Sequence, residues 1–186
     1  VDHKIAIVGF ASQSGYGNNT EILSIAGDNS EYGSGGNDSV GKAYNQLITE
    51  DYKSALTGCN DVILDNAIKA IATNGATRAD LGMEMAQKIL KQNADPDRNQ
   101  VVILFTDGEP TSGNSFETTV ANGAISQANA IKNSGATVYT IGIFNGADVN
   151  GSDQSNRYMQ YVSSNYPNAT AMNDPNAGNN TDGYYL

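Results

Sequence analysis

The sequence predicts an α/β protein with a doubly wound, Rossmann-like open sheet that is mostly parallel and carries helices on both faces. Residues 101–105, Val-Val-Ile-Leu-Phe, are the strongest strand signal, an apolar run typical of a buried parallel strand. Residues 116–132 follow with apolar side chains at helical spacing, and residues 136–144 form a second apolar run. Strand, helix and strand in this order predict a right-handed crossover between parallel strands.

The N-terminal part of the chain contains further strand signals. Residues 4–10, Lys-Ile-Ala-Ile-Val-Gly-Phe, are rich in β-branched residues and are expected to form a buried parallel strand. Residues 21–25 alternate as a short edge strand would. Residues 27–41 contain too few apolar side chains to form a packed element, and we interpret residues 26–60 as a loop-rich insertion.

Helical spacing recurs in the middle and near the end of the chain. Residues 61–72 and 79–91 each place apolar side chains on one helical face, on either side of a turn at residues 74–77. Asn114 and Glu117 suit the cap of the helix at 116–132. The α/β pattern is completed by three expected elements: a helix near residues 155–166 and short strands near Ala169 and Tyr184.

Composition limits the class of protein. With 186 residues, 39% of them hydrophobic, the chain can bury one substantial core, so a single domain over residues 1–186 is expected. Its net charge of −10 would repel phosphate backbones and anionic lipids, which argues against nucleic acid as a partner. No run of about 18 apolar residues exists, so direct membrane insertion is not expected. Cys59 is the only cysteine and cannot form an internal disulfide.

The surplus of Asn, Ser, Thr, Gly and Tyr over Lys and Arg is similar to the make-up of Gram-positive surface proteins. We therefore expect an extracellular or cell-surface location in a bacterium of that type.

A carboxylate stands where the strongest predicted strand ends, in the sequence Thr106-Asp107-Gly108-Glu109. Open α/β sheets bind ligands in the crevice at the carboxyl ends of their strands. The alternative is that Asp107 and Gly108 form a simple turn, but a tight hairpin would need a second strand at once. Residues 109–113, Glu-Pro-Thr-Ser-Gly, are not such a strand, so Asp107 is a candidate ligand-binding residue.

Thr77 is a second candidate, at the turn before the helix at 79–91. With Asp80 three residues further on, Thr77 could be the N-cap of a capping box. Its hydroxyl could equally ligate a metal ion, and the two roles are compatible.

Four segments resemble successive signatures of the von Willebrand factor A (VWA) family: residues 4–12, 75–83, 102–109 and 136–144. In that family a metal-ion-dependent adhesion site combines an Asp-x-Ser-x-Ser loop, a threonine and an aspartate. By this resemblance Thr77 matches the threonine and Asp107 the aspartate. Their oxygens suit Mg²⁺, or alternatively Mn²⁺ or Ca²⁺, with one position left for an acidic group of the partner.

The chain departs from the family pattern at the first of these loops. No Asp-x-Ser-x-Ser occurs, and in the nearest string, residues 10–14, Phe10 stands where the carboxylate should be. The resemblance then makes residues 4–12 the second strand of the family and residues 183–186 its last strand. We expect a VWA domain truncated at both ends, with an incomplete metal site. A complementing strand from the rest of a parent protein is one expected partner.

Two other motifs resemble binding loops only in part, and an enzymatic role is not expected. Residues 36–43 approach a phosphate-binding loop, but Ala43 replaces the Ser or Thr that holds Mg²⁺. Residues 148–153 offer oxygens for Ca²⁺ without the spacing of an EF-hand, so a solvated loop is expected. His3 is the only histidine and lies at the terminus, so no Ser-His-Asp or Cys-His arrangement can form, and no enzyme is expected.

The sequence therefore favours two hypotheses for the function. The first is an extracellular adhesion or protein-binding module whose Mg²⁺-dependent site, containing Thr77 and Asp107, binds a protein or surface polymer that presents a carboxylate. The second is a structural or assembly domain of a bacterial surface structure with a vestigial metal site. An intracellular VWA subunit of an ATP-driven metal-insertion or chaperone complex is a third hypothesis.

Overall fold

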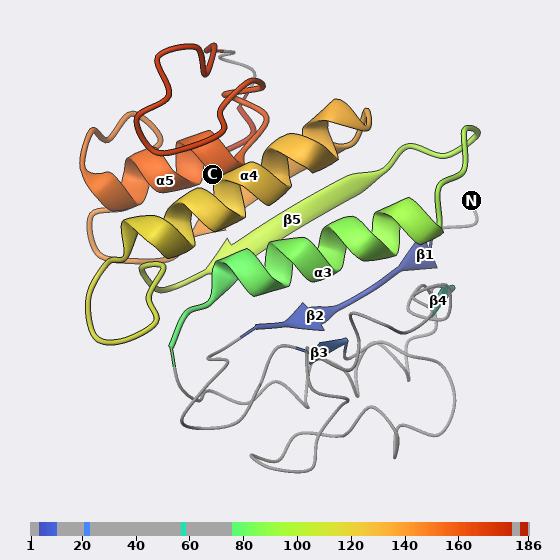
Figure 1. Cartoon of the computed structure of the whole chain (residues 1–186), viewed down its shortest axis with the longest axis horizontal. Coiled ribbons are helices and arrows are strands. Elements are labelled where there is room, and N and C mark those ends of the chain that lie inside the picture. Colours follow the sequence, from blue (N-terminus) through green and yellow to red (C-terminus); the bar gives the residue numbers. More distant parts are fainter. Residues whose placement is uncertain (1–3, 11–20, 23–56, 59–75, 180–182, 186) are drawn as a thin grey trace. The chain divides into compact units, whose positions relative to one another are not determined.

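A computed structural model describes residues 4–10, 21–22, 57–58, 76–179 and 183–185 (Figure 1). The chain divides into two compact units, Val1–Ala94 and Asp95–Leu186, which are described separately. The single domain predicted from the sequence stays a prediction. The predicted helix at 61–72, and nearly all of the predicted insertion at 26–60, lie outside the described residues.

In the described part of the first unit, four short strands pair in two antiparallel ladders. Strand β1 (Lys4–Ile5) pairs with β4 (Thr57–Gly58), and β2 (Val8–Gly9) pairs with β3 (Glu21–Ile22). The edge strand predicted from residue 21 is confirmed over its first two residues. The continuous buried parallel strand predicted over residues 4–10 is wrong, because β-branched composition favours extended backbone without specifying its partner or direction.

Helix α3 (Ala79–Gln92) confirms the amphipathic pattern of the sequence. Its buried face consists of Ala79, Leu81, Gly82, Met83, Met85 and Ile89. Gly82 marks a close approach, since a Cβ built there would lie 2.9 Å from Cδ1 of Phe10. The absence of a side chain at this position therefore lets α3 pack against the Phe10 ring.

The second unit is built on the parallel pair β5 (Val101–Thr106) and β6 (Thr137–Gly142). Leu104 lies opposite Thr140, and α4 (Thr118–Asn133) connects the two strands. The parallel pairing expected from the crossover and the doubly wound α/β class are confirmed. Helix α5 (Gln154–Val162) follows β6 and is shorter than the segment expected at 155–166.

The C-terminal segment adds a third position to this parallel arrangement. Tyr185 forms a parallel bridge with Thr140, and the Thr140 N–H donates to the Tyr184 carbonyl at 2.8 Å. Within the described residues 183–185, the strand expected near Tyr184 is a single bridge. The strand expected near Ala169 is wrong: this residue is fully buried in a loop, where its N–H donates to the Tyr166 carbonyl.

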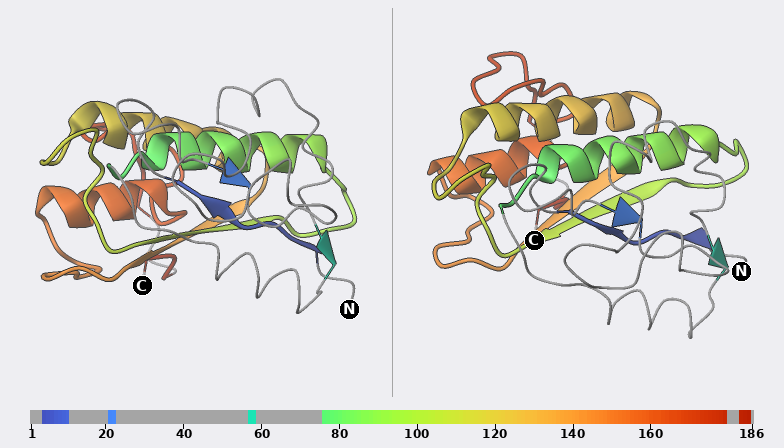
Figure 2. Two further views of the ribbon diagram at one scale, coloured as in Figure 1. Left: turned by 90° about the horizontal axis from the view of Figure 1, so that it is seen from below. Right: turned by 60° about the horizontal axis from the view of Figure 1, so that its bottom comes forward.

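The core of the second unit lies on one face of β5 and β6. Val138 and Thr140 are fully buried there, and both views in Figure 2 place α4 and α5 on the same side of the pair. The Thr140 hydroxyl donates to the Met159 carbonyl of α5 at 3.1 Å. The helices contribute the buried side chains Val120, Ala121, Ala124, Ile125, Ala128, Ile131, Tyr158, Met159 and Val162. None of the described helices is long and apolar enough to cross a membrane.

Candidate functional site

The loop that follows β5 is held at both ends by backbone contacts. The Thr106 carbonyl accepts from the Ile143 N–H at 2.9 Å, which extends the β5–β6 ladder to the last residue of β5. The buried Thr106 hydroxyl contacts both the N–H and the carbonyl of Gly108 at 3.2 Å. At the far end, the Pro110 carbonyl accepts from the Glu117 N–H at 2.8 Å. The chain therefore turns immediately after the strand.

Asp107 lies at the start of this turn and is exposed. Among the residues that the structure describes, no hydrogen bond or ion pair involves its carboxylate. A carboxylate that is held on an ordered turn, and is not engaged by the protein, can accept a cation or a hydrogen-bond donor from outside. This is the position at which open α/β sheets bind ligands.

Glu109, in contrast, is engaged by the protein. Its Oε1 accepts a hydrogen bond at 2.9 Å from the hydroxyl of Ser155, in the first turn of α5. The two residues are 46 positions apart in the sequence. Sequence reasoning missed Ser155, because nothing in the local pattern around it indicates a contact over that separation.

The first turn of α5 is capped by Asp153. The Asp153 Oδ1 accepts from the N–H groups of Ser155 at 3.0 Å and Asn156 at 3.1 Å. The pKa of Asp153 is lowered below its ordinary value, chiefly by the bond from the Asn156 N–H and next by the bond from the Asn156 side chain. The cap is therefore an ionised carboxylate, the form that stabilises a helix N-terminus best.

The side chain of Asn156 is the centre of a buried polar network. Its Nδ2 donates to the Gly146 carbonyl at 2.9 Å and to Asp153 Oδ2 at 2.5 Å. Its Oδ1 accepts from the Asp148 N–H at 2.9 Å and from the Tyr185 hydroxyl at 2.6 Å. Both donors and both acceptor lone pairs of the amide are thus used. Burial, followed by the charges of Asp153 and Asp148, raises the pKa of Tyr185.

The loop between β6 and α5 is organised around this network. Gln160 Nε2 donates to the carbonyls of Val149 at 3.1 Å and Gly151 at 2.8 Å. Asp148 Oδ1 accepts from the Asn150 N–H at 2.8 Å. In the segment 148–153, for which a solvated loop was predicted, all residues except the half-buried Gly151 are exposed, which confirms that prediction. Across the described residues, no group of three or more His, Cys, Asp or Glu side chains is arranged to hold a metal ion.

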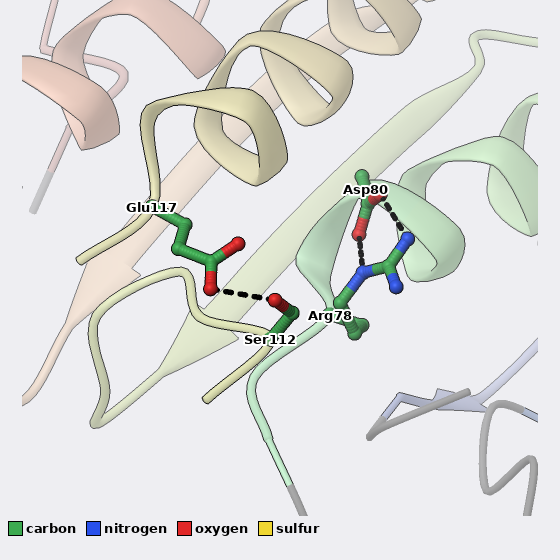
Figure 3. Close-up of polar contacts among 4 residues, drawn as sticks. All are labelled: Arg78, Asp80, Ser112 and Glu117. Atoms are coloured by element: carbon green, nitrogen blue, oxygen red, sulfur yellow. Dashed lines mark hydrogen bonds and ion pairs between the residues drawn. The ribbon is translucent and has the colours of Figure 1, made fainter. Parts of the chain in front are cut away.

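The capping box, one of the two roles considered for Thr77, does not form. The N-cap of α3 is Arg78, and Thr77 precedes it, half-buried, with its carbonyl accepting from the Ala79 N–H at 3.0 Å. Asp80 instead forms a bidentate pair with Arg78, at 2.8 Å and 2.7 Å (Figure 3). An Arg–carboxylate fork satisfies the acidic side chain more strongly than one backbone N–H would.

The predicted cap of α4 is also corrected. Glu117 is the N-cap residue, but its side chain makes no capping bond, and Asn114 lies outside the helix. The Glu117 Oε1 accepts from the Ser112 hydroxyl at 2.6 Å, as Figure 3 shows.

Thr77 and Asp107 thus belong to different compact units, and their coordination of one ion stays a prediction. The donor types are compatible with Mg²⁺, since a hydroxyl and an unengaged carboxylate are hard oxygen ligands.

Comparison with protein families gives one match. Residues 60–182 match the sequence profile of the von Willebrand factor type A domain, over a segment that includes Thr77, Asp107 and all of α3 to α5. A search of curated proteins finds no significant match.

Proposed function

Because this chain belongs to the von Willebrand factor type A family, whose members are commonly protein-interaction and adhesion modules, we propose that it binds its partner through a divalent cation. The proposed cation is Mg²⁺, with Mn²⁺ or Ca²⁺ as alternatives, and the residues that would hold it are Thr77 and Asp107. The proposed setting is extracellular, at a bacterial surface.

The observation that carries this proposal is the state of Asp107. It follows β5 directly, on a turn closed by Thr106 and Gly108, and none of the described residues neutralises or hydrogen-bonds it. The neighbouring acidic side chains Glu109 and Glu117 each accept a serine hydroxyl. Asp107 is therefore the acidic group of this loop that is available to a ligand.

The charge of the chain supports a bridging ion and a carboxylate on the partner. With a net charge of −10, the protein repels an acidic partner at long range. A divalent cation on Asp107 would reverse the charge locally and would leave coordination positions for the partner's carboxylate. Recognition of an acidic protein or polymer should therefore be strictly cation-dependent.

The test combines calorimetric titration of the full chain with Mg²⁺ and binding to immobilised poly-L-glutamate. We expect polymer binding in Mg²⁺, its loss in chelator, and loss of both activities in Asp107→Ala. Thr77→Ala should weaken Mg²⁺ binding, while Thr77→Ser retains the hydroxyl and should bind.

Asp97→Ala is the matched control, because Asp97 is also exposed but lies before β5, at the other end of the strand. This variant should bind as the wild type does. Binding that persists in chelator, or that survives Asp107→Ala, would refute the cation-dependent module. It would favour the structural or assembly domain with a vestigial metal site.

A further inference from the structure

In the part of the chain that the structure describes, one side-chain hydrogen bond, from Ser155 to Glu109, joins the loop that carries Asp107 to helix α5. We propose that Ser155 and Glu109 are positioning residues for the Asp107 carboxylate, and that their hydrogen bond holds residues 107–109 against the first turn of α5. The consequence for metal affinity rests on the proposed function, whereas the consequence for loop order does not.

The loop is short and is fixed independently on each side of Asp107. On the strand side, the Thr106 hydroxyl contacts both backbone polar groups of Gly108. On the helix side, the Glu109 carboxylate reaches Ser155 at 2.9 Å. Pro110, which follows, is buried. Removing the Glu109 contact would leave Asp107 held by Thr106 on the strand side and, three residues further on, by the backbone bond between Pro110 and Glu117.

Ser155 is a rigid point of attachment. It is 7% exposed, and its N–H donates to the Asp153 cap at 3.0 Å. The next residue, Asn156, is 1% exposed and is anchored by four side-chain hydrogen bonds. The Ser155 hydroxyl therefore cannot follow a moving loop, so the bond transmits the position of α5 to Glu109.

Glu109 and Ser155 would orient the metal ligand Asp107 without touching the ion themselves. Mg²⁺ requires near-ideal octahedral geometry, so the direction of the Asp107 carboxylate affects its affinity. Partners that orient a ligand without touching the ion typically change metal affinity by roughly 10- to 100-fold when they are removed. Ser155 would act through Glu109 on the backbone that carries Asp107.

The chain offers a matched control for the contact. Ser112 and Glu117 form the same kind of bond, serine hydroxyl to glutamate Oε1 at 2.6 Å, but in an exposed position after the loop. Ser112→Ala therefore removes a Ser–Glu bond without loosening residues 107–109.

The first measurement is amide hydrogen exchange at Gly108 in chelator, so that no metal is involved. Ser155→Ala and Glu109→Ala should each speed exchange by roughly fivefold, the factor expected for loss of one typical hydrogen bond. The double variant should exchange no faster than either single variant, because the two residues act through one contact. Ser155→Thr, which retains the hydroxyl, and Ser112→Ala should match the wild type.

The second measurement is Mg²⁺ calorimetry on the same variants. Ser155→Ala and Glu109→Ala should each weaken binding by about tenfold or more, with rescue by Ser155→Thr and no effect of Ser112→Ala. If Ser155→Ala fails to fold, Glu109→Ala, at an exposed position, provides the same test.

The two readouts separate the possible failures. Unchanged exchange at Gly108 in both single variants would overturn the positioning role, whatever the metal result. Faster exchange in a chain that binds no Mg²⁺ would support the positioning role and refute the proposed function. Loss of Mg²⁺ binding in Asp107→Ala, but not in Ser155→Ala or Glu109→Ala, would refute the positioning role alone.

Discussion

Asn156→Ala should destabilise the protein more than any ordinary surface substitution, because one buried amide joins four separate groups. The Tyr185 hydroxyl is the most costly partner to lose, since Tyr185 is 2% exposed and water cannot easily replace the bond. A buried polar group left without its partner costs about 1–3 kcal/mol. Gly146 and Asp148 lie in the exposed loop, where water can compensate, so their bonds contribute about 0.5–1.5 kcal/mol each. The sum of these three contributions gives an expected loss in unfolding free energy of about 2–6 kcal/mol.

The assay is urea unfolding followed by circular dichroism, with the free energy extrapolated to water. The matched control is Asn133→Ala: Asn133 is exposed, and its side chain makes one bond, to Asn129 at 2.9 Å. Its cost should stay within about 0.5 kcal/mol, as for most surface substitutions. A change of that small size in Asn156→Ala would refute the view that this network holds the loop, the helix and the C-terminal segment together.

Three further predictions concern the same unit. Gly151→Ala should destabilise, because a Cβ there would overlap the Asn156 side chain, and thermal unfolding should detect a lower melting temperature. Tyr185→Phe should cost about 1–2 kcal/mol in urea unfolding through the lost bond to Asn156, and little change would show that water replaces that bond. Lys132 donates to the carbonyls of residues 161, 163 and 166, and burial lowers its pKa from 10.5 to about 8. Between pH 8 and 10.5 the Lys132 side chain is protonated in the unfolded chain but not in the folded one. The unfolding free energy of the wild type, relative to that of Lys132→Met, should therefore rise over this range by at most about 3 kcal/mol. A difference between the two proteins that does not change with pH would contradict this.

Part of the fold could be predicted because it depends on local periodicity. The apolar run that became β5, the helical spacing of α4 and the second run that became β6 each specify an element without reference to the rest of the chain. Their order then predicts a parallel crossover, since no short connection can join parallel strands. The same reasoning placed Asp107 at the end of a strand, which the structure confirms.

The predictions from sequence were wrong where a residue could pair with more than one partner. The β-branched run at residues 4–10 favoured extended backbone, but the direction of pairing was decided by its two partners, residues 21–22 and 57–58. The position of Asp80 in the sequence is compatible with a capping box, but in the folded chain its carboxylate forms two stronger bonds with Arg78. Propensity describes what a segment can do alone, and tertiary contacts select among those options.

The sequence by itself determined the α/β class, the resemblance to the VWA family and the two candidate ligands Thr77 and Asp107. Only the tertiary structure decided how the Asp107 loop is held, through Glu109 and Ser155, and how Asn156 joins the loop between β6 and α5 to Tyr185. The physical reason is the range of the interactions. Helical and strand periodicity repeat within a few residues and can be read from the chain, whereas a hydrogen bond between residues 46 positions apart exists only after folding has brought them together.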